Sequence, residues 1–246
     1  AASYANGTTI IKNCACEPEI LDLTNFLKKM GVNIKWISNR EIKIIGGKKF
    51  KPASHSVMFD RIEAGTFVIA GALIGKKLKI VSLETKINKK ELKILRKMGV
   101  KVKINKNEIV ILNSKNIRPV KVKTEPDPGF PTDLQAQIMV LMTRANGTSK
   151  IKENIFENRF MHVPELNRMG AKIKVSGNLS KIDGIKSLYG AEVMATDLRA
   201  SVSLVLAGLI AKNRTIINRV YHLDRGYENL ESKLRKCGAN ISRTNY

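Results

Sequence analysis

The chain has 246 residues, with 44 Lys and Arg against 21 Asp and Glu, which gives a formal net charge of +23 at pH 7. Because 43% of the residues are hydrophobic and 26% are charged, the composition is that of a globular protein of one or two domains. The longest apolar runs, 67–75 and 201–211, are much shorter than the roughly 20 residues of a membrane-spanning helix, so we expect no membrane partner. The three cysteines, Cys14, Cys16 and Cys237, form neither a disulfide framework nor a zinc pattern, which predicts a cytoplasmic protein.

The net charge by itself points to nucleic acid, but the composition favours another explanation. Lys outnumbers Arg 31 to 13, and aromatic residues make only 5% of the chain. Proteins that bind specific nucleic acids rely on Arg for base edges and on aromatic side chains for stacking. Lys, Ile and Asn together supply 79 residues. Each of the three has at least one codon that contains only A and T, so an AT-rich genome would raise the frequencies of all three together. We therefore predict a solvated Lys-rich surface and no specific nucleic-acid partner.

Four segments of the sequence repeat one pattern, at 7–31, 75–99, 147–170 and 213–238. Each begins at a Gly or Asn and continues with a short strand, an acidic stretch and a helix whose apolar residues recur at spacings of three and four. Each helix ends at a Gly, which is the usual stop residue. An alternating strand is expected after that Gly, at 32–36, 100–104, 171–175 and 239–242. Four copies of one pattern predict a protein built from structural repeats.

A second kind of helix, apolar on almost all sides, precedes three of these segments at 60–74, 133–144 and 197–211. Helices of this kind lie in the interior of a domain. Residues 1–6 resemble the end of a fourth such helix, so we expect the chain to start inside a repeat unit. The predicted fold class is therefore α/β, built from βαβαββ units of about 65 to 70 residues that associate to cover their sheets.

Residues with catalytic potential gather where these helices begin. No dinucleotide, P-loop, zinc-protease or hydrolase motif is present, and the three His residues have no companions at metal-ligand spacing, so no metal is expected. Acidic and Arg residues flank the helix starts, and such ends attract anions. Asp is also a preferred N-cap residue, so Asp60, Asp133 and Asp197 could instead be bonded only to backbone N–H groups. The residues at the helix starts are Asp60, Arg61, Glu63, Asp133, Asp197 and Arg199, and Asp224 and Arg225 occupy an equivalent end of the last repeat.

Four longer strings carry a resemblance to a known family. FPTDLQAQ (130–137), IFENRFMHVPEL (155–166), MATDLRAS (194–201) and YHLDRGY (221–227) closely resemble the UDP-N-acetylglucosamine 1-carboxyvinyltransferases, a family of enolpyruvyltransferases. EPE (17–19) and DRIEAG (60–65) fit as well. The resemblance implies an inverted α/β fold of two domains, each with three βαβαββ units. Residues 1–59 would be the last unit of an incomplete first domain, and residues 60–246 would form the second.

The resemblance also implies an activity. The family transfers the enolpyruvyl group of phosphoenolpyruvate to the 3′-hydroxyl of UDP-N-acetylglucosamine and releases phosphate, without a cofactor. This is the first committed step of peptidoglycan synthesis in the cytoplasm, and hence serves cell wall biogenesis, cell shape and cell division. Asp133 would be the base on the sugar hydroxyl, and Asp197 a second acid in the same cleft. The backbone of Ile155 would contact the nucleotide sugar, and the side chains around phosphoenolpyruvate would be Arg159, Arg199 and Arg225.

The sequence departs from the family because the family's N-terminal portion is absent. The resemblance implies that this portion carries a Lys-Asn pair and the loop with the catalytic residue, Cys or Asp, so the catalytic cysteine is absent from this chain. Cys237 occupies a helix-end position that holds Met in the other repeats, which predicts a buried packing residue. We therefore expect the 246 residues alone to be inactive, and phosphate release by the purified chain would contradict this.

Two alternatives remain open at this point. The first is the enolpyruvyltransferase that acts on 3-phosphoshikimate, which shares the repeats; the IFENRFMH string argues against it. The second is a noncatalytic remnant that binds through its basic surface. A DNA-binding assay at increasing salt would identify such a protein, because adventitious binding by a polycation weakens steeply with salt and has no sequence preference.

Overall fold

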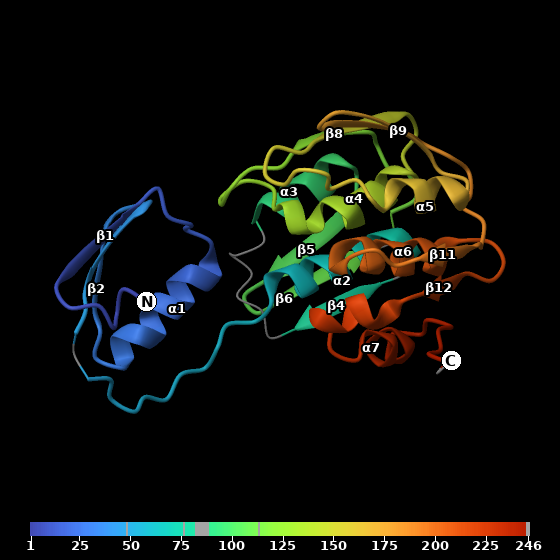
Figure 1. The fold of residues 1–246 in the computed structure, drawn as a ribbon. Coiled ribbons are helices and arrows are strands. Elements are labelled where there is room, and N and C mark those ends of the chain that lie inside the picture. The colour runs from blue at the N-terminus through green and yellow to red at the C-terminus, as the bar shows by residue number, and fades with distance from the viewer. Residues whose placement is uncertain (48, 76, 82–88, 113, 245–246) are drawn as a thin grey trace. The chain divides into compact units, whose positions relative to one another are not determined.

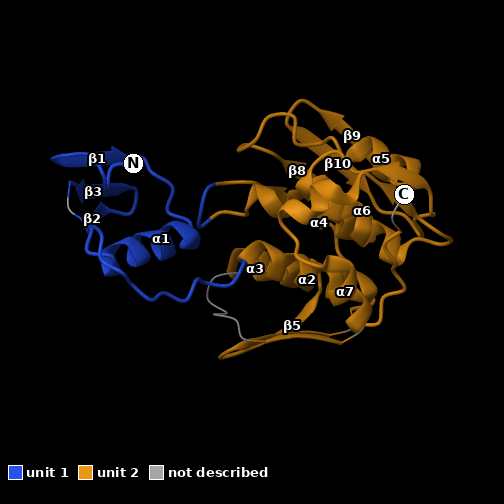
Figure 2. Cartoon of the chain, turned by 60° about the horizontal axis from the view of Figure 1, so that its bottom comes forward, with its two compact units in different colours: residues 1–60, 126–128 blue, residues 61–125, 129–246 orange. Residues whose placement is uncertain are grey.

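The computed structural model describes residues 1–47, 49–75, 77–81, 89–112 and 114–244. They form two compact units (Figure 2): unit 1 consists of residues 1–60 with 126–128, and unit 2 of residues 61–125 with 129–246. No helix in the described part of the chain is long and apolar enough to cross a membrane. The acidic stretch expected near residue 84 in the second repeat lies outside the described residues.

Unit 1 is one repeat, with a helix packed on an antiparallel sheet. Its elements are β1 (Thr8–Lys12), α1 (Pro18–Lys29), β2 (Asn33–Ser38) and β3 (Glu41–Ile45), and the strand order is β1-β3-β2. Pro at the start of α1 and Lys in its last turn suit the two ends of a helix. Residues 1–6 form a turn before β1. The core of the unit is small and consists of Val32, Ile34, Ile42 and Ile44.

Unit 2 contains the other three repeats (Figure 1). The first has α2 (Arg61–Ile74), β4 (Leu78–Val81), α3 (Lys89–Lys97), β5 (Lys101–Asn105) and β6 (Glu108–Leu112). The second has β7 (Lys121–Lys123), the 3-10 turn η1 (Thr132–Leu134), α4 (Gln135–Met142), β8 (Thr148–Lys152), α5 (Val163–Arg168), β9 (Lys172–Ser176) and β10 (Leu179–Asp183). The third has β11 (Glu192–Met194), α6 (Leu198–Ile210), β12 (Ile216–Asn218), the 3-10 helix η2 (Val220–Arg225) and α7 (Leu230–Lys236).

The sheets of unit 2 combine antiparallel hairpins with parallel pairs. The strand orders are β4-β6-β5, β7-β8-β10-β9 and β11-β12. β7 pairs in parallel with β8, and β11 with β12, so α4 and α6 are the crossover helices that such parallel pairs require. In the described residues, only the second repeat of unit 2 shows the full predicted βαβαββ order, from β7 to β10.

The backbone confirms the predicted repeat boundaries. The four starting residues, Gly7, Gly75, Gly147 and Asn213, all have positive φ angles, between 68° and 139°. The four Gly residues that end the helices have φ angles between 87° and 92°. Gly adopts this region without steric cost, and Asn is among the few other residues that do so routinely.

The three internal helices form the core of unit 2, as their apolar sequences predict. α2, α4 and α6 contact one another, and all eight residues of α4 are buried. α2 comes close to the turn before α4, because a Cβ added at Gly65 would lie 2.5 Å from the Cδ1 atom of Leu134. A larger residue at Gly65 would therefore force the side chain of Leu134, the residue after Asp133, to shift.

One predicted strand is not present. Residues 239–242, expected to form the strand after the fourth repeat, have no regular structure. In the other three repeats the equivalent strand pairs with the strand that follows it, as β5 pairs with β6. The described residues after 242 provide no such partner, and an extended segment without a partner leaves its backbone groups unpaired.

The predicted burial of Cys237 is wrong. This residue follows the last turn of α7, and it is exposed.

Candidate functional site

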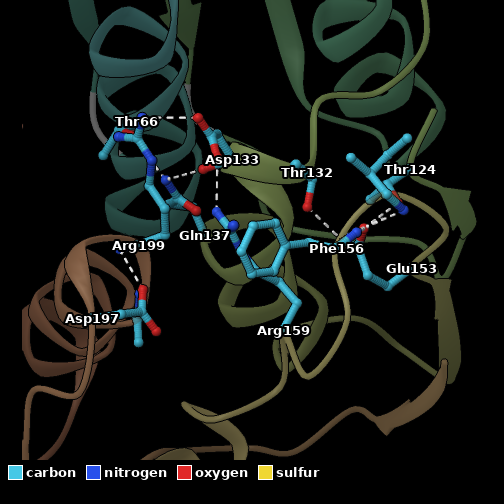
Figure 3. A network of polar contacts seen from close by, with 12 residues as sticks. Thr66, Thr124, Thr132, Asp133, Gln137, Glu153, Phe156, Arg159, Asp197 and Arg199 are labelled. Carbon is cyan, nitrogen blue, oxygen red and sulfur yellow. Dashed lines mark hydrogen bonds and ion pairs between the residues drawn. The ribbon is translucent and has the colours of Figure 1, made fainter. Parts of the chain in front are cut away.

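Asp133 lies between two Arg side chains in unit 2 (Figure 3). Its Oδ1 atom is 2.7 Å from Nη2 of Arg159, and its Oδ2 atom is 3.0 Å from Nη2 of Arg199. The two guanidinium groups are largely buried, with 14% and 15% of their side chains exposed, whereas the Asp133 side chain is 37% exposed. The cluster therefore presents one partly accessible carboxylate and two sheltered cations.

The fold brings these three residues together from separate segments. Asp133 lies in η1, immediately before α4; Arg159 lies in the segment between β8 and α5; and Arg199 lies in the first turn of α6. Neither η1 nor α4 has a side-chain cap. The N-cap interpretation of Asp133 is therefore wrong, and its carboxylate pairs with the two Arg residues instead.

The two guanidinium groups determine the charge state of Asp133. Burial by itself would raise the pKa of Asp133, but Arg199 and Arg159 offset this effect and hold the pKa below its ordinary value of 3.8. Burial by itself would lower the pKa of Arg199, because it disfavours the charged form. Contacts with Tyr227 and Asp133 outweigh this effect and raise the pKa of Arg199 above its ordinary value. At neutral pH the site therefore contains a carboxylate and charged guanidinium groups.

A network of buried hydrogen bonds holds the side chain of Arg199. Nη1 of Arg199 donates to the hydroxyl of Tyr227 at 3.3 Å, and that hydroxyl lies 2.9 Å from Oγ1 of Thr66. Thr66 donates to the carbonyl of Ile62, so we assign Tyr227 as the donor to Thr66 and as the acceptor from Arg199. Nε2 of Gln137 donates to Thr66 and to the carbonyl of Asp133. Side chains from all three internal helices thus meet at Arg199 and Asp133.

Asp197 is the N-cap of α6. Its Oδ1 atom accepts hydrogen bonds from the backbone N–H groups of Arg199, at 2.8 Å, and Ala200, at 2.9 Å. The capping alternative is confirmed for this residue, and its predicted role as a catalytic acid stays a prediction. Since the cap lies two residues before Arg199, it fixes the turn from which that guanidinium projects.

We expect the Asp197→Ala substitution to lower the free energy of unfolding by about 1 kcal/mol, because two backbone donors lose their acceptor. Asp197→Asn is the matched control, since Asn caps helices as well as Asp does. Urea unfolding followed by circular dichroism measures both variants. A loss as large in the Asn variant as in the Ala variant would show that the charge of Asp197, and not its capping bonds, stabilises the chain.

The other two predicted site residues, Ile155 and Arg225, form no hydrogen bond or ion pair with the side chains of the Asp133 cluster. The side chain of Arg225, the last residue of η2, is exposed and makes no ion pair or hydrogen bond with another described residue. The backbone N–H of Ile155 donates to Oε1 of Glu153, at 2.9 Å, and its side chain is 43% exposed. Their predicted contacts with substrate stay predictions.

Several acids and bases at the other helix starts pair elsewhere. Nη1 of Arg61 lies 3.9 Å from Oε1 of Glu91. Nζ of Lys233 lies 2.7 Å from Oε1 of Glu63. Asp224 accepts two hydrogen bonds from Arg243. No group of three or more His, Cys, Asp or Glu residues in the described chain is arranged to hold a metal ion.

Sequence reasoning missed four buried polar residues of the site: Thr66, Gln137, Glu153 and Tyr227. All four are at most 3% exposed. A signal was present for Thr66 and Gln137, because each is a polar residue within a helix that is otherwise apolar on nearly all sides. Buried polar side chains need hydrogen-bond partners, and those positions indicate a network.

Comparison with known proteins identifies the family. The model of the family described as EPSP synthase (3-phosphoshikimate 1-carboxyvinyltransferase) matches residues 1–234. The chain belongs to this family. Among solved structures with similar folds, that of the enolpyruvyl transferase NikO from Streptomyces tendae has a TM-score of 0.90 at 29% identity, and the match covers 98% of this chain and 58% of that chain. An EPSP synthase from Acinetobacter baumannii, at 18% identity, has a TM-score of 0.75 over 100% of this chain and 60% of its own. The predicted enolpyruvyltransferase fold is confirmed.

Relatives within the EPSP synthase family carry a more specific name. A protein of Pelagibacter ubique named UDP-N-acetylglucosamine 1-carboxyvinyltransferase is 58% identical over 245 residues. A protein of Caldanaerobacter subterraneus named UDP-N-acetylglucosamine 1-carboxyvinyltransferase 1 is 53% identical over 243 residues. These matches cover 100% and 99% of the chain and 59% of each relative, so the chain spans about 59% of their length. The resemblance found in the sequence motifs is thus confirmed.

Proposed function

We propose that the chain is part of an enzyme that transfers the enolpyruvyl group of phosphoenolpyruvate to the 3′-hydroxyl of UDP-N-acetylglucosamine and releases phosphate. The observation that carries this proposal is the Asp133 carboxylate between Arg159 and Arg199. The names of relatives that are 52–58% identical support it. The reaction belongs to peptidoglycan synthesis, and we accordingly propose a cytoplasmic protein with a role in cell shape and division.

The cluster contains the two kinds of group that this reaction needs, cations that bind oxyanions and a carboxylate that can act as a base. Phosphoenolpyruvate carries a phosphate and a carboxylate, and planar guanidinium groups bind such oxyanions with paired hydrogen bonds. When these anions engage Arg159 and Arg199, Asp133 loses part of the positive surroundings that lower its pKa, and it becomes a stronger base. It can then accept the proton of the sugar hydroxyl as that oxygen adds to C2 of phosphoenolpyruvate and the methylene carbon takes up a proton. Loss of a proton from that carbon and of phosphate from C2 then restores the double bond.

The second candidate is transfer to 3-phosphoshikimate, because the matching family model bears that description. The motif around Arg159 argues for the nucleotide sugar, as do the names of the relatives that are more than half identical. The solved EPSP synthases are only 18% identical to this chain, so they support the fold and not the acceptor.

Phosphate release separates these candidates. We expect the full-length protein to release phosphate from phosphoenolpyruvate when UDP-N-acetylglucosamine is present and not with 3-phosphoshikimate. The 246-residue chain alone serves as the control and is expected to release none. Release with 3-phosphoshikimate only would favour the second candidate. No release with either acceptor would favour a noncatalytic role, which the salt dependence of DNA binding then tests.

A further inference from the structure

We propose that Glu153 is a positioning residue for the sugar side of the site, a role that rests on the proposed function. Its buried carboxylate fixes the loop of residues 153–156, and so determines where the carbonyl of Ile155 and the ring of Phe156 face the acceptor substrate. Glu153 is 3% exposed and follows directly after β8. Figure 3 shows it beside Thr124, Thr132 and Phe156.

The carboxylate of Glu153 accepts four hydrogen bonds. Its Oε1 atom accepts from Oγ1 of Thr124 at 2.7 Å, and from the backbone N–H groups of Ile155 and Phe156 at 2.9 and 3.0 Å. Its Oε2 atom accepts from Oγ1 of Thr132 at 3.0 Å. Glu153 therefore connects the loop to the strand end at Thr124 and to Thr132, the neighbour of Asp133.

An ionised carboxylate is the group that these surroundings require. All four partners are donors, and no cation in the described residues forms an ion pair with Glu153. Hydrogen bonds from uncharged donors to a buried anion are strong, because the group would otherwise lie in a low-dielectric interior. An amide in the same place would offer only an uncharged oxygen to the N–H groups of Ile155 and Phe156 and would turn its NH₂ group toward the hydroxyl of Thr132, so weaker hydrogen bonds would hold the loop.

The loop presents surfaces suited to an uncharged sugar or base. The N–H groups of Ile155 and Phe156 point inward to Glu153, and the carbonyl of Ile155 accepts no hydrogen bond from another described residue. Phe156 is 58% exposed, and the guanidinium carbon of Arg159 lies 4.8 Å from the centre of its ring. A carbonyl and an aromatic face bind hydroxyl groups and planar rings, whereas the anion-binding groups lie at Arg159 and Arg199.

The Glu153→Gln variant of the full-length protein tests this proposal. We expect the KM for UDP-N-acetylglucosamine to rise about 10- to 100-fold, the range for loss of hydrogen bonds to a charged group. The KM for phosphoenolpyruvate should change less than about threefold, because the Arg residues keep their own partners. Glu157→Gln is the matched control: it is the same substitution four residues along, at an exposed side chain, and it should leave both KM values unchanged.

A merely structural role would give a different result. If Glu153 only stabilises the fold, the variant loses active protein, kcat falls, and both KM values stay unchanged; that result would overturn the proposal. An equal rise of both KM values would overturn it as well. Thr132→Val removes only the Oε2 contact and is the second variant should Glu153→Gln not fold. It is expected to raise the same KM by a smaller factor, and an unchanged KM would overturn the proposal.

Amide hydrogen exchange needs no substrate, so it tests the anchorage of the loop by Glu153 independently of the proposed function. In the 246-residue chain, we expect the amides of Ile155 and Phe156 to exchange slowly with solvent, and about 10-fold or more faster in Glu153→Gln. If the full-length wild type does not use UDP-N-acetylglucosamine, the proposed function fails and the sugar-side role fails with it. The amide exchange alone would then decide whether Glu153 anchors the loop.

Discussion

Replacing Asp133 with Asn in the full-length enzyme should lower kcat by about 10²- to 10⁴-fold, the usual contribution of a general base. Asn has nearly the same shape as Asp but cannot accept the proton of the sugar hydroxyl. The KM for phosphoenolpyruvate should not rise, because Arg159 and Arg199 lose the carboxylate that competes with the substrate for their donors. Steady-state kinetics with each substrate varied in turn measures both quantities.

The matched control for this variant is Asp183→Asn. Asp183 lies at the end of β10, where it accepts from Thr148 and lies 3.6 Å from Lys181, away from the predicted site residues. Its substitution should leave kcat unchanged. If Asp133→Asn retained kcat within tenfold while the KM for UDP-N-acetylglucosamine rose, Asp133 would hold the sugar hydroxyl without acting as the base.

The repeats were predictable because their boundaries depend on local backbone chemistry. A Gly or Asn at a positive φ angle is required wherever the chain turns into a strand or leaves a helix, and that requirement is visible in the sequence. The burial of α2, α4 and α6 was predictable for a similar reason, since each helix is apolar on nearly all sides. The strand expected at 239–242 failed because a strand also needs a partner, and pairing is not a local property.

The site was predictable only in part. The motif strings identified Asp133, Arg159 and Arg199, and the structure brings these three into one cluster. The polar groups that hold them come from sequence-distant positions: Tyr227 reaches Thr66 across 161 residues, and Glu153 reaches Thr132 across 21. No pattern in a single sequence specifies such pairs, because they form only when segments that are distant in the sequence pack together.

His162 should make the stability of the chain depend on pH. It is buried beside Met139, and its Nε2 atom lies 3.2 Å from the sulfur. Burial lowers the pKa of His162 from 6.5 to about 4, although Asp197 acts in the opposite direction, and Arg159 adds to the decrease. The folded chain therefore keeps this imidazole neutral in a pH range where the unfolded chain protonates it.

The sign of the effect follows from proton binding. Between about pH 4 and 6.5 the unfolded state binds more protons at His162, so the free energy of unfolding rises with pH through this window. The contribution is complete above pH 6.5 and is lost as the pH falls toward 4. The difference between a pKa of 6.5 and one of about 4 corresponds to a contribution of about 3 kcal/mol.

His162→Gln is the variant that isolates this contribution, because Gln is polar, of similar size and does not titrate. Urea unfolding of both proteins should be measured between pH 4 and 8 by circular dichroism, since the single Trp, Trp36, lies in unit 1 and does not report on unit 2. The difference in free energy of unfolding, wild type minus variant, should grow by about 3 kcal/mol from pH 4 to 7. Parallel pH curves would mean that His162 titrates alike in both states. A neutral His162 at pH 7 leaves Arg159 and Arg199 as the cations that surround Asp133.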